Sequence, residues 1–114
     1  MDEKITNFNV DELTPEQVSF QLILYSGNAR SKVIQSLRAY REGNVEEAEQ
    51  LLKEAGEDVN QLHDIHFKMI QKETAGEKSE FSLLLMHSED HLMSTLTMKE
   101  LVTELIALFK EKQL

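Results

Sequence analysis

Apolar and small residues recur at alternating spacings of four and three through the middle of the chain. This feature restricts the fold more than any other. Between residues 44 and 73 the series consists of Ala48, Leu52, Ala55, Val59, Leu62, His66 and Met69. Such spacing places its members on one face of an α-helix, like the core positions of a heptad repeat. We therefore predict a long helix over about 44–73 that needs other helices to cover its apolar face.

A helix of similar length is predicted over about 14–42. Thr14 is suited to cap its start, and Gln17 stands where it completes a capping box. Gly43 is suited to the left-handed position that ends many helices. The predicted apolar face consists of Val18, Leu22, Tyr25, Ala29, Val33, Leu37 and Tyr40.

The remaining segments complete an all-α organisation. Asn44 and Glu47 predict a second capping box at the start of the middle helix. Residues 72–79 have no apolar pattern and are predicted to form a loop, with a third helix over about 80–112. Residues 1–13 are expected to be flexible or to pack on a neighbour. The sequence thus predicts one domain, an antiparallel three-helix up-down-up bundle.

The third predicted helix is apolar on nearly all sides in its first half. Successive helical residues lie about 100° apart. In the second half, one apolar arc contains Met98, Leu101, Val102, Leu105, Ile106, Leu108 and Phe109. In the first half, the same arc carries Leu83, Leu84, His87, Asp90 and His91, and the opposite side carries Leu85, Leu92, Met93 and Leu96 around Glu89. A small bundle cannot bury both sides of one helix, so we expect a second surface from another copy or a partner.

Composition excludes several functional classes. The net charge is −9, which argues against nucleic acid as a partner, because no basic patch would neutralise phosphates. The chain has no cysteine and therefore no thiolate zinc site or cysteine nucleophile. The charged start MDEKITNFNV is unlike a signal peptide, and the longest apolar run, Leu83–Met86, is far too short to span a bilayer. We expect a cytoplasmic protein.

The run His87-Ser88-Glu89-Asp90-His91 interrupts the apolar pattern of the third helix. His87, Asp90 and His91 lie three and four residues apart, which places them on one helix face. Ionisable groups on an apolar face are costly unless they are paired, protonated, bound to a metal or placed on a symmetry axis. We interpret this cluster as functional rather than structural.

The common metal and nucleotide motifs are absent. No histidine follows a glutamate by three residues, as in di-iron bundles, and there is no His-Glu-x-x-His motif or glycine-rich phosphate loop. Two kinds of site are left open: a nucleophilic histidine, or a divalent-ion site built from Asp90. We interpret His66 as an ordinary core histidine and His63 as a surface residue.

The segment LLLMHSEDHLM (83–93) resembles the signature of a protein family, the IIA components of the lactose/cellobiose branch of the bacterial sugar phosphotransferase system. The family version is close to LLLVHAQDHLM. The segments SGNARS (26–31), REGNVEEAEQLLKEA (41–55) and GEKSEFSLLL (76–85) agree with the family as well. The resemblance extends over roughly 16–112.

The resemblance implies a phosphocarrier in which His87 accepts a phosphoryl group from phospho-HPr and passes it to a cysteine of the cognate IIB protein, which serves the membrane permease IIC. It also implies a homotrimer in which three copies of Asp90 hold one divalent ion, usually Mg²⁺. Ser88 and His91 are expected to support the phosphoryl group as hydrogen-bond donors. Two residues depart from the family pattern, since Glu89 replaces glutamine and Ser88 replaces alanine.

Two other functions are compatible with the sequence. One is a non-enzymatic oligomeric scaffold whose His/Asp cluster is a structural metal site, and the other is a two-component phosphotransfer domain. The apolar surroundings of His87 and the neighbouring Asp90 argue against the second. The transported sugar is open between cellobiose-like β-glucosides, which we favour, lactose and chitobiose.

Overall fold

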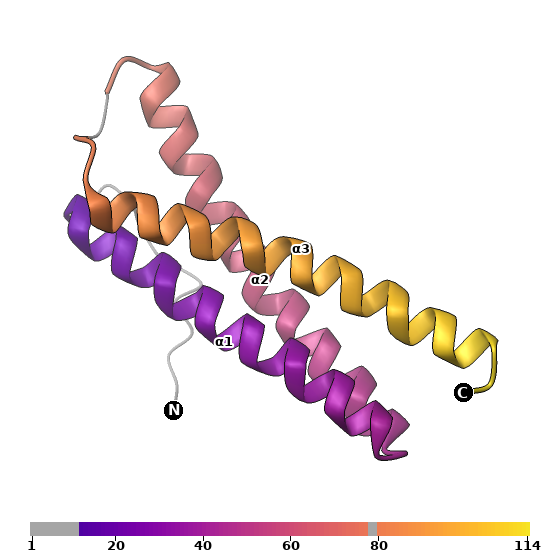
Figure 1. Cartoon of the computed structure of the whole chain (residues 1–114). Helices are drawn as coiled ribbons and strands as arrows, with labels where there is room; N and C mark the ends of the chain where they lie inside the picture. Colours follow the sequence, from indigo (N-terminus) through magenta and orange to yellow (C-terminus); the bar gives the residue numbers. More distant parts are fainter. Residues whose placement is uncertain (1–11, 78–79) are drawn as a thin grey trace.

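Three long helices form an antiparallel bundle in the computed structural model, which describes residues 12–77 and 80–114. They are α1 (Pro15–Arg41), α2 (Val45–Thr74) and α3 (Leu83–Glu111). Figure 1 shows α1 and α3 running in the same direction and α2 running against them. The predicted all-α, up-down-up architecture is confirmed. The prediction for residues 1–11 falls outside the described residues.

The ends of α1 follow the rules that predicted them. The Thr14 hydroxyl accepts a hydrogen bond from the Gln17 backbone N–H, at 3.1 Å, and the Gln17 side chain accepts one from the Thr14 N–H, at 2.9 Å. At the other end Gly43 adopts φ +88°, and the Asn44 N–H donates to the carbonyl of Ala39 at 2.9 Å. This is a Schellman turn, which returns the chain toward α2.

Two details of the predicted helix ends differ. Asn44 makes no side-chain capping bond, so the predicted capping box is wrong. Its backbone, at φ −92° and ψ 72°, belongs to the Schellman turn and is not extended as a capping residue requires. The third helix begins at Leu83, later than predicted, because the Ser82 hydroxyl accepts from the Leu85 N–H at 3.0 Å and caps the helix there.

The core consists of two clusters arranged along α1, which packs against both α2 and α3, whereas α2 and α3 touch each other much less. The first cluster, at the end where α1 and α3 begin, comprises Val18, Leu22, Leu62, Ile65 and Leu92. The second comprises Val33, Ala55, Val102 and Ile106. Between them Ser26 and Thr95 are fully buried, which lets α1 and α3 approach closely.

The side of α3 that faces the core differs from the apolar arc that was predicted from the spacing of about 100° between helical residues. Val102 and Ile106 are buried, but Leu101 and Leu108, predicted on the same arc, are 59% and 46% exposed. Leu92, predicted on the opposite side, is 1% exposed. The prediction was wrong because it weighed hydropathy alone, and the buried face of α3 includes the small polar residues Ser88 and Thr95.

A second apolar strip runs along the outside of α3 and is exposed in the single chain. We call it the outer face of α3, and it consists of Leu83, Met86, Asp90, Met93, Leu101 and Leu108. Its first members follow one another at spacings of three and four residues, as the positions of a helix–helix seam do. In the first half of α3, apolar side chains thus lie both in the core and on this exposed face, as predicted for that half. In the described part of the chain, no helix is long and apolar enough to cross a membrane.

Candidate functional site

His87 and His91 form a close pair on adjacent turns of α3. His87 is exposed and His91 is half-buried. Their Nε2 atoms lie 3.1 Å apart, and the rings meet edge to face with centroids 4.4 Å apart. Such a contact requires one ring to donate a proton and the other to offer a lone pair. The pair is what helical spacing of four residues predicts for these two side chains.

Burial of His91 assigns the roles in this pair. Among the described residues, its Nδ1 is buried and has no hydrogen-bond partner. A buried N–H without an acceptor is rarer and more costly than a buried lone pair, so we place the His91 proton on Nε2. His91 then donates to His87, whose Nε2 offers its lone pair and whose Nδ1 carries the proton. The exposed His87 ring therefore presents Nε2 as its basic nitrogen.

Asp90 occupies the outer face of α3, between Met86 and Met93 on adjacent turns. It is exposed in the single chain and forms no ion pair with any residue of the ranges 12–77 and 80–114. The carboxylate would lose its hydration only if another surface covered this face. Asp90 thus lies next to apolar side chains, as the spacing of about 100° between helical residues predicts.

Ser88 faces the core and not the histidine pair. It is fully buried, and its hydroxyl donates to the Leu85 carbonyl of the same helix at 2.8 Å. The hydroxyl proton is therefore used within α3. This orientation favours His91 over Ser88 as the donor beside His87.

Glu89 points toward α2, where it meets His66. The His66 Nε2 lies 2.8 and 3.1 Å from the two carboxylate oxygens of Glu89, and both side chains are partly exposed. Residues 87 and 89 point about 200° apart on a helix, so the Glu89 charge lies away from His87. His66 was interpreted as an ordinary core histidine, and its pairing with Glu89 was missed. The only signal in the sequence was the change from glutamine to glutamate in the family motif.

A further polar contact joins α1 to the backbone of α3 at His91 and was also missed. The Arg30 guanidinium donates to the Ser94 hydroxyl at 2.6 Å, and that hydroxyl donates to the His91 carbonyl at 3.3 Å. Close by, the Thr95 hydroxyl donates to the Ser26 carbonyl at 3.5 Å. The segment SGNARS thus forms the contact of α1 with α3 beside the candidate site.

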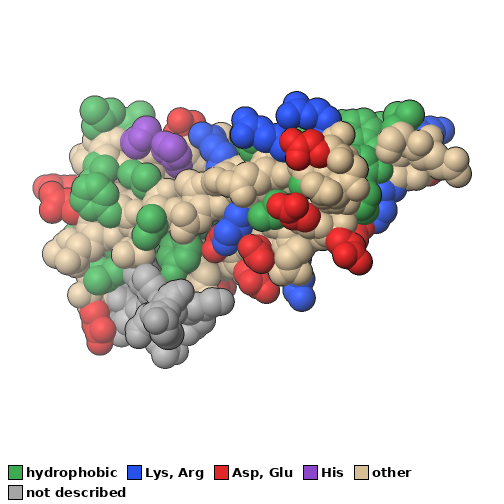
Figure 2. Space-filling model, turned by 90° about the horizontal axis from the view of Figure 1, so that it is seen from below, with side chains coloured by type: hydrophobic (Ala, Val, Ile, Leu, Met, Phe, Trp, Pro, Cys, Tyr) green, Lys and Arg blue, Asp and Glu red, His purple; other side chains and the backbone are tan. Residues whose placement is uncertain are grey.

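Hydrophobic side chains are exposed on the surface at this end of the bundle. Phe20 and Leu24 of α1 are 60% and 53% exposed, and Leu83 and Met86 of α3 are 81% and 49% exposed. Figure 2 shows histidine side chains on the surface with hydrophobic side chains around them, at the end where α1 and α3 begin. Exposed apolar side chains gathered in this way mark a surface that meets other proteins.

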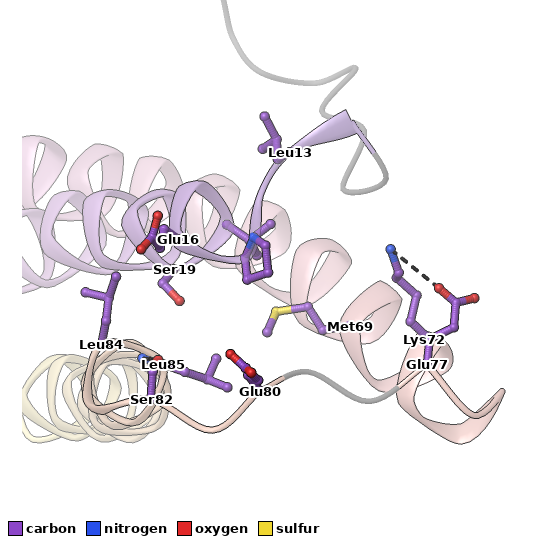
Figure 3. Close-up of a pocket in the computed structure, with 12 residues that line it drawn as sticks. Leu13, Glu16, Ser19, Met69, Lys72, Glu77, Glu80, Ser82, Leu84 and Leu85 are labelled. Atoms are coloured by element: carbon purple, nitrogen blue, oxygen red, sulfur yellow. Dashed lines mark hydrogen bonds and ion pairs between the residues drawn. The ribbon is translucent and has the colours of Figure 1, made fainter.

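The same end of the bundle holds a cavity of about 410 Å³ between the start of α1, the end of α2 and the start of α3. Figure 3 shows apolar residues such as Met69 and Leu84 on its walls, together with the carboxylates of Glu16 and Glu80. Its lining contains neither His87 nor any other member of the His-Ser-Glu-Asp-His run. The candidate site is therefore a surface patch rather than this cavity.

An exposed histidine paired with a second histidine ring, on the partly apolar surface of a three-helix bundle, is the arrangement expected of a class of proteins that pass a group between macromolecular partners. Comparison with known proteins identifies the class. Residues 17–110 match the family described as "PTS system, Lactose/Cellobiose specific IIA subunit". The chain belongs to this family of IIA components of the sugar phosphotransferase system.

Individual relatives agree with this assignment. The chain is 64% identical over 111 residues to the oligo-beta-mannoside-specific EIIA component of Bacillus subtilis, covering 97% of this chain and 96% of that protein. It is 40% identical over 96 residues to the lichenan-specific IIA component of the same organism, covering 84% of this chain and 87% of that protein.

Solved structures share the fold. The cellobiose-specific enzyme IIA of Bacillus anthracis is 43% identical, with a TM-score of 0.82, covering 89% of this chain and 94% of that one. The IIA(chitobiose) chain of the Escherichia coli IIA–HPr complex is 29% identical, with a TM-score of 0.72, covering 93% and 98%.

Proposed function

We propose that this IIA component carries a phosphoryl group on His87, taking it from phospho-HPr and passing it to a cysteine of its cognate IIB protein. The observation that carries the proposal is the exposed His87 ring, with its Nε2 held 3.1 Å from the Nε2 of His91. A neutral imidazole is a good nucleophile near pH 7. HPr as the phosphoryl donor is supported by the solved structure of a relative of this chain in complex with HPr.

The transfer needs positioning more than covalent assistance. The Nε2 lone pair of His87 attacks the phosphorus of phospho-HPr, the new N–P bond forms, and the bonding electrons of the old N–P bond return to the HPr imidazole. The His91 N–H, which donates to that nitrogen in the free protein, must release it before the attack and can then donate to a phosphoryl oxygen. In the second half, a IIB thiolate attacks the same phosphorus and the His87 ring leaves as a neutral imidazole.

We further propose that the chain assembles as a homotrimer through the outer face of α3. A face on which Leu83, Met86, Met93, Leu101 and Leu108 are all exposed needs a covering surface, and equivalent faces of three copies supply it. The three Asp90 carboxylates would then converge near one axis, where unpaired anions are costly.

A divalent ion fits this arrangement. Carboxylate oxygens are the ligands that Mg²⁺ prefers. In the described residues of a single chain, no group of three or more potential ligands is present, so the ion requires all three copies. When bound, it would offset most of the negative charge of the three Asp90 carboxylates. It takes no part in the phosphoryl transfer, which the histidine pair performs on the adjacent side of α3.

The sugar is proposed from the relatives. Identity to the oligo-beta-mannoside-specific protein is 64%, against 40% for the lichenan-specific and 36% for a lactose-specific one. We therefore favour uptake of a β-linked mannoside through a matching IIB and the permease IIC, in place of the cellobiose-like sugar expected from the sequence. We place the reaction in the cytoplasm, where phosphoenolpyruvate, the phosphoryl source of such a system, is available.

The test is phosphorylation by phosphoenolpyruvate, enzyme I and HPr. Wild type and His66→Ala should become labelled in an acid-labile form, and His87→Ala should not, because it lacks the nucleophile. Transfer onward should be faster to the IIB of an oligo-β-mannoside system than to that of a lactose system. An unlabelled wild type would instead favour the scaffold with a structural metal site, and label retained by His87→Ala would disprove the assignment of the residue.

A further inference from the structure

Arg30 is the single charged residue of the segment SGNARS, and the proposed reaction gives it no role. Its guanidinium reaches from α1 across the seam to α3, where it donates to the Ser94 hydroxyl at 2.6 Å. The side chain is half-buried. Its Nε is fully buried and has no hydrogen-bond partner among the described residues.

The charge of Arg30 is not balanced within the chain. None of the described carboxylates forms an ion pair with this guanidinium, although Lys32, two residues on, pairs with Asp58 at 2.8 Å. The chain carries a net charge of −9, so acidic side chains are abundant and their absence at this position is notable. A half-buried cation without a counter-ion is costly, and a guanidinium is the side chain best suited to phosphate.

The histidine pair lies on the same edge of α3 as this cation. Ser94, which receives the Arg30 hydrogen bond, donates to the His91 carbonyl at 3.3 Å, and His91 contacts His87 at 3.1 Å. Residues 87 and 94 are two helical turns apart and so face the same way, about 10 Å apart along the axis. At that distance in a partly buried seam, charges still interact appreciably.

The phosphoryl group is the anion that appears at this edge during the proposed reaction. It adds about −1.5 to −2 of charge to His87. Glu89 does not oppose it, because its carboxylate is directed to His66 on α2. Asp90, one helical turn away on the outer face, adds to the negative potential. A fixed positive charge beside the histidine pair would offset the charges of both the phosphoryl group and Asp90.

We infer that Arg30 is the electrostatic partner of the phosphoryl group on His87, stabilising the phosphorylated protein relative to phospho-HPr. This inference rests on the proposed function of His87. Arg30 acts through its electrostatic field, its hydrogen bond to Ser94 holds the guanidinium at this edge of α3, and it does not touch the attacking nitrogen. This electrostatic role explains why the α1 segment that packs against α3 beside the site carries an arginine between small residues.

The experiment measures the equilibrium constant for phosphoryl exchange between phospho-HPr and the protein at low and high salt. Arg30→Gln keeps a donor for Ser94 and removes the charge, and Arg30→Lys keeps the charge. Arg41→Gln is the matched control, since Arg41 is exposed at the far end of α1. We expect Arg30→Gln to lower the constant about tenfold at low salt and less at high salt. Arg30→Lys should stay within about twofold of wild type and Arg41→Gln should be unchanged.

Several results would overturn the inference. They are an unchanged constant in Arg30→Gln, an equal loss in Arg30→Lys and Arg30→Gln, or a loss that does not diminish with salt. If circular dichroism shows that Arg30→Gln does not fold, the test is the exchange equilibrium constant of the wild type. The inference requires this constant to fall as salt is raised. Failure of the proposed function itself is a separate outcome, recognised by a wild type that HPr does not phosphorylate.

Discussion

Five consecutive residues of α3 have five different surroundings, because each step along a helix turns the side chain by about 100°. His87 is exposed, Ser88 lies in the core, Glu89 meets α2, Asp90 occupies the outer face, and His91 lies half-buried beside its partner ring. The polar run that interrupts the apolar pattern is therefore not one cluster. We assign the proposed chemistry to the histidine pair, whereas Ser88 packs in the core, Glu89 contacts α2, and Asp90 is exposed.

The Glu89 departure from the family motif should affect stability and leave transfer almost unchanged. Glu89→Gln removes the charge that faces His66, a partly exposed pair, so we expect a loss of about 0.5 kcal/mol in unfolding free energy by urea titration. The rate of phosphorylation by phospho-HPr should change by less than about twofold, since the carboxylate is directed away from His87.

The control for that change is Glu57→Gln, at an exposed position of α2. A double-mutant cycle with His66→Gln should show that the two losses are not additive, as expected for contacting residues. A tenfold change in the phosphorylation rate of Glu89→Gln would contradict the orientation of the side chain described above.

Among the elements, helix spans were predictable and the pairing of helix faces was not. The periodic apolar residues and Thr14 located α1 and α2 closely, because these signals are local. The buried face of α3 was misassigned because Ser88 and Thr95 are buried by their fit against neighbouring helices, which hydropathy does not encode. For the same reason the contacts of Glu89 and Arg30 could not be predicted, although the shared helix face of His87 and His91 could.

The turn between α1 and α2 offers a test of the backbone argument. Gly43 adopts φ +88°, and a Cβ there would meet nothing within 4 Å, so the cost of Gly43→Ala is conformational alone. We expect a loss of about 1 kcal/mol in unfolding free energy. Gly56→Ala is the matched control, because Gly56 is helical and a Cβ would make ordinary contact with Lys99. It should stabilise by up to about 1 kcal/mol. Equal effects of the two changes would contradict the assignment of the turn.

At the scale of the whole molecule, the single chain leaves apolar surface exposed along α3. In the described residues the core is divided into two small clusters, and the strip of apolar side chains on α3, which Asp90 interrupts, is left uncovered. Three copies joined through this strip would bury it. They would also bring three Asp90 carboxylates together, so that the interface is apolar along most of its length and anionic at one level. Assembly of chains that each carry a net charge of −9 would then depend on a cation beside the three Asp90 carboxylates.

Substitutions at Asp90 separate the apolar and the ionic parts of this interface. Asp90→Leu extends the apolar strip and removes the converging anions, so the trimer should form without a divalent ion and tolerate EDTA. Asp90→Lys replaces anions by cations that no counter-ion is placed to neutralise, and should weaken assembly most. Light scattering with and without EDTA, and thermal unfolding of all three proteins, give the comparison. In EDTA the wild type should show a smaller assembly mass or a lower melting temperature, since like charges at close range in a partly buried site cost several kcal/mol. A monomeric wild type at micromolar concentration would disprove the trimer, and trimers of wild type and Asp90→Lys with equal thermal stability would disprove the role of Asp90 in it.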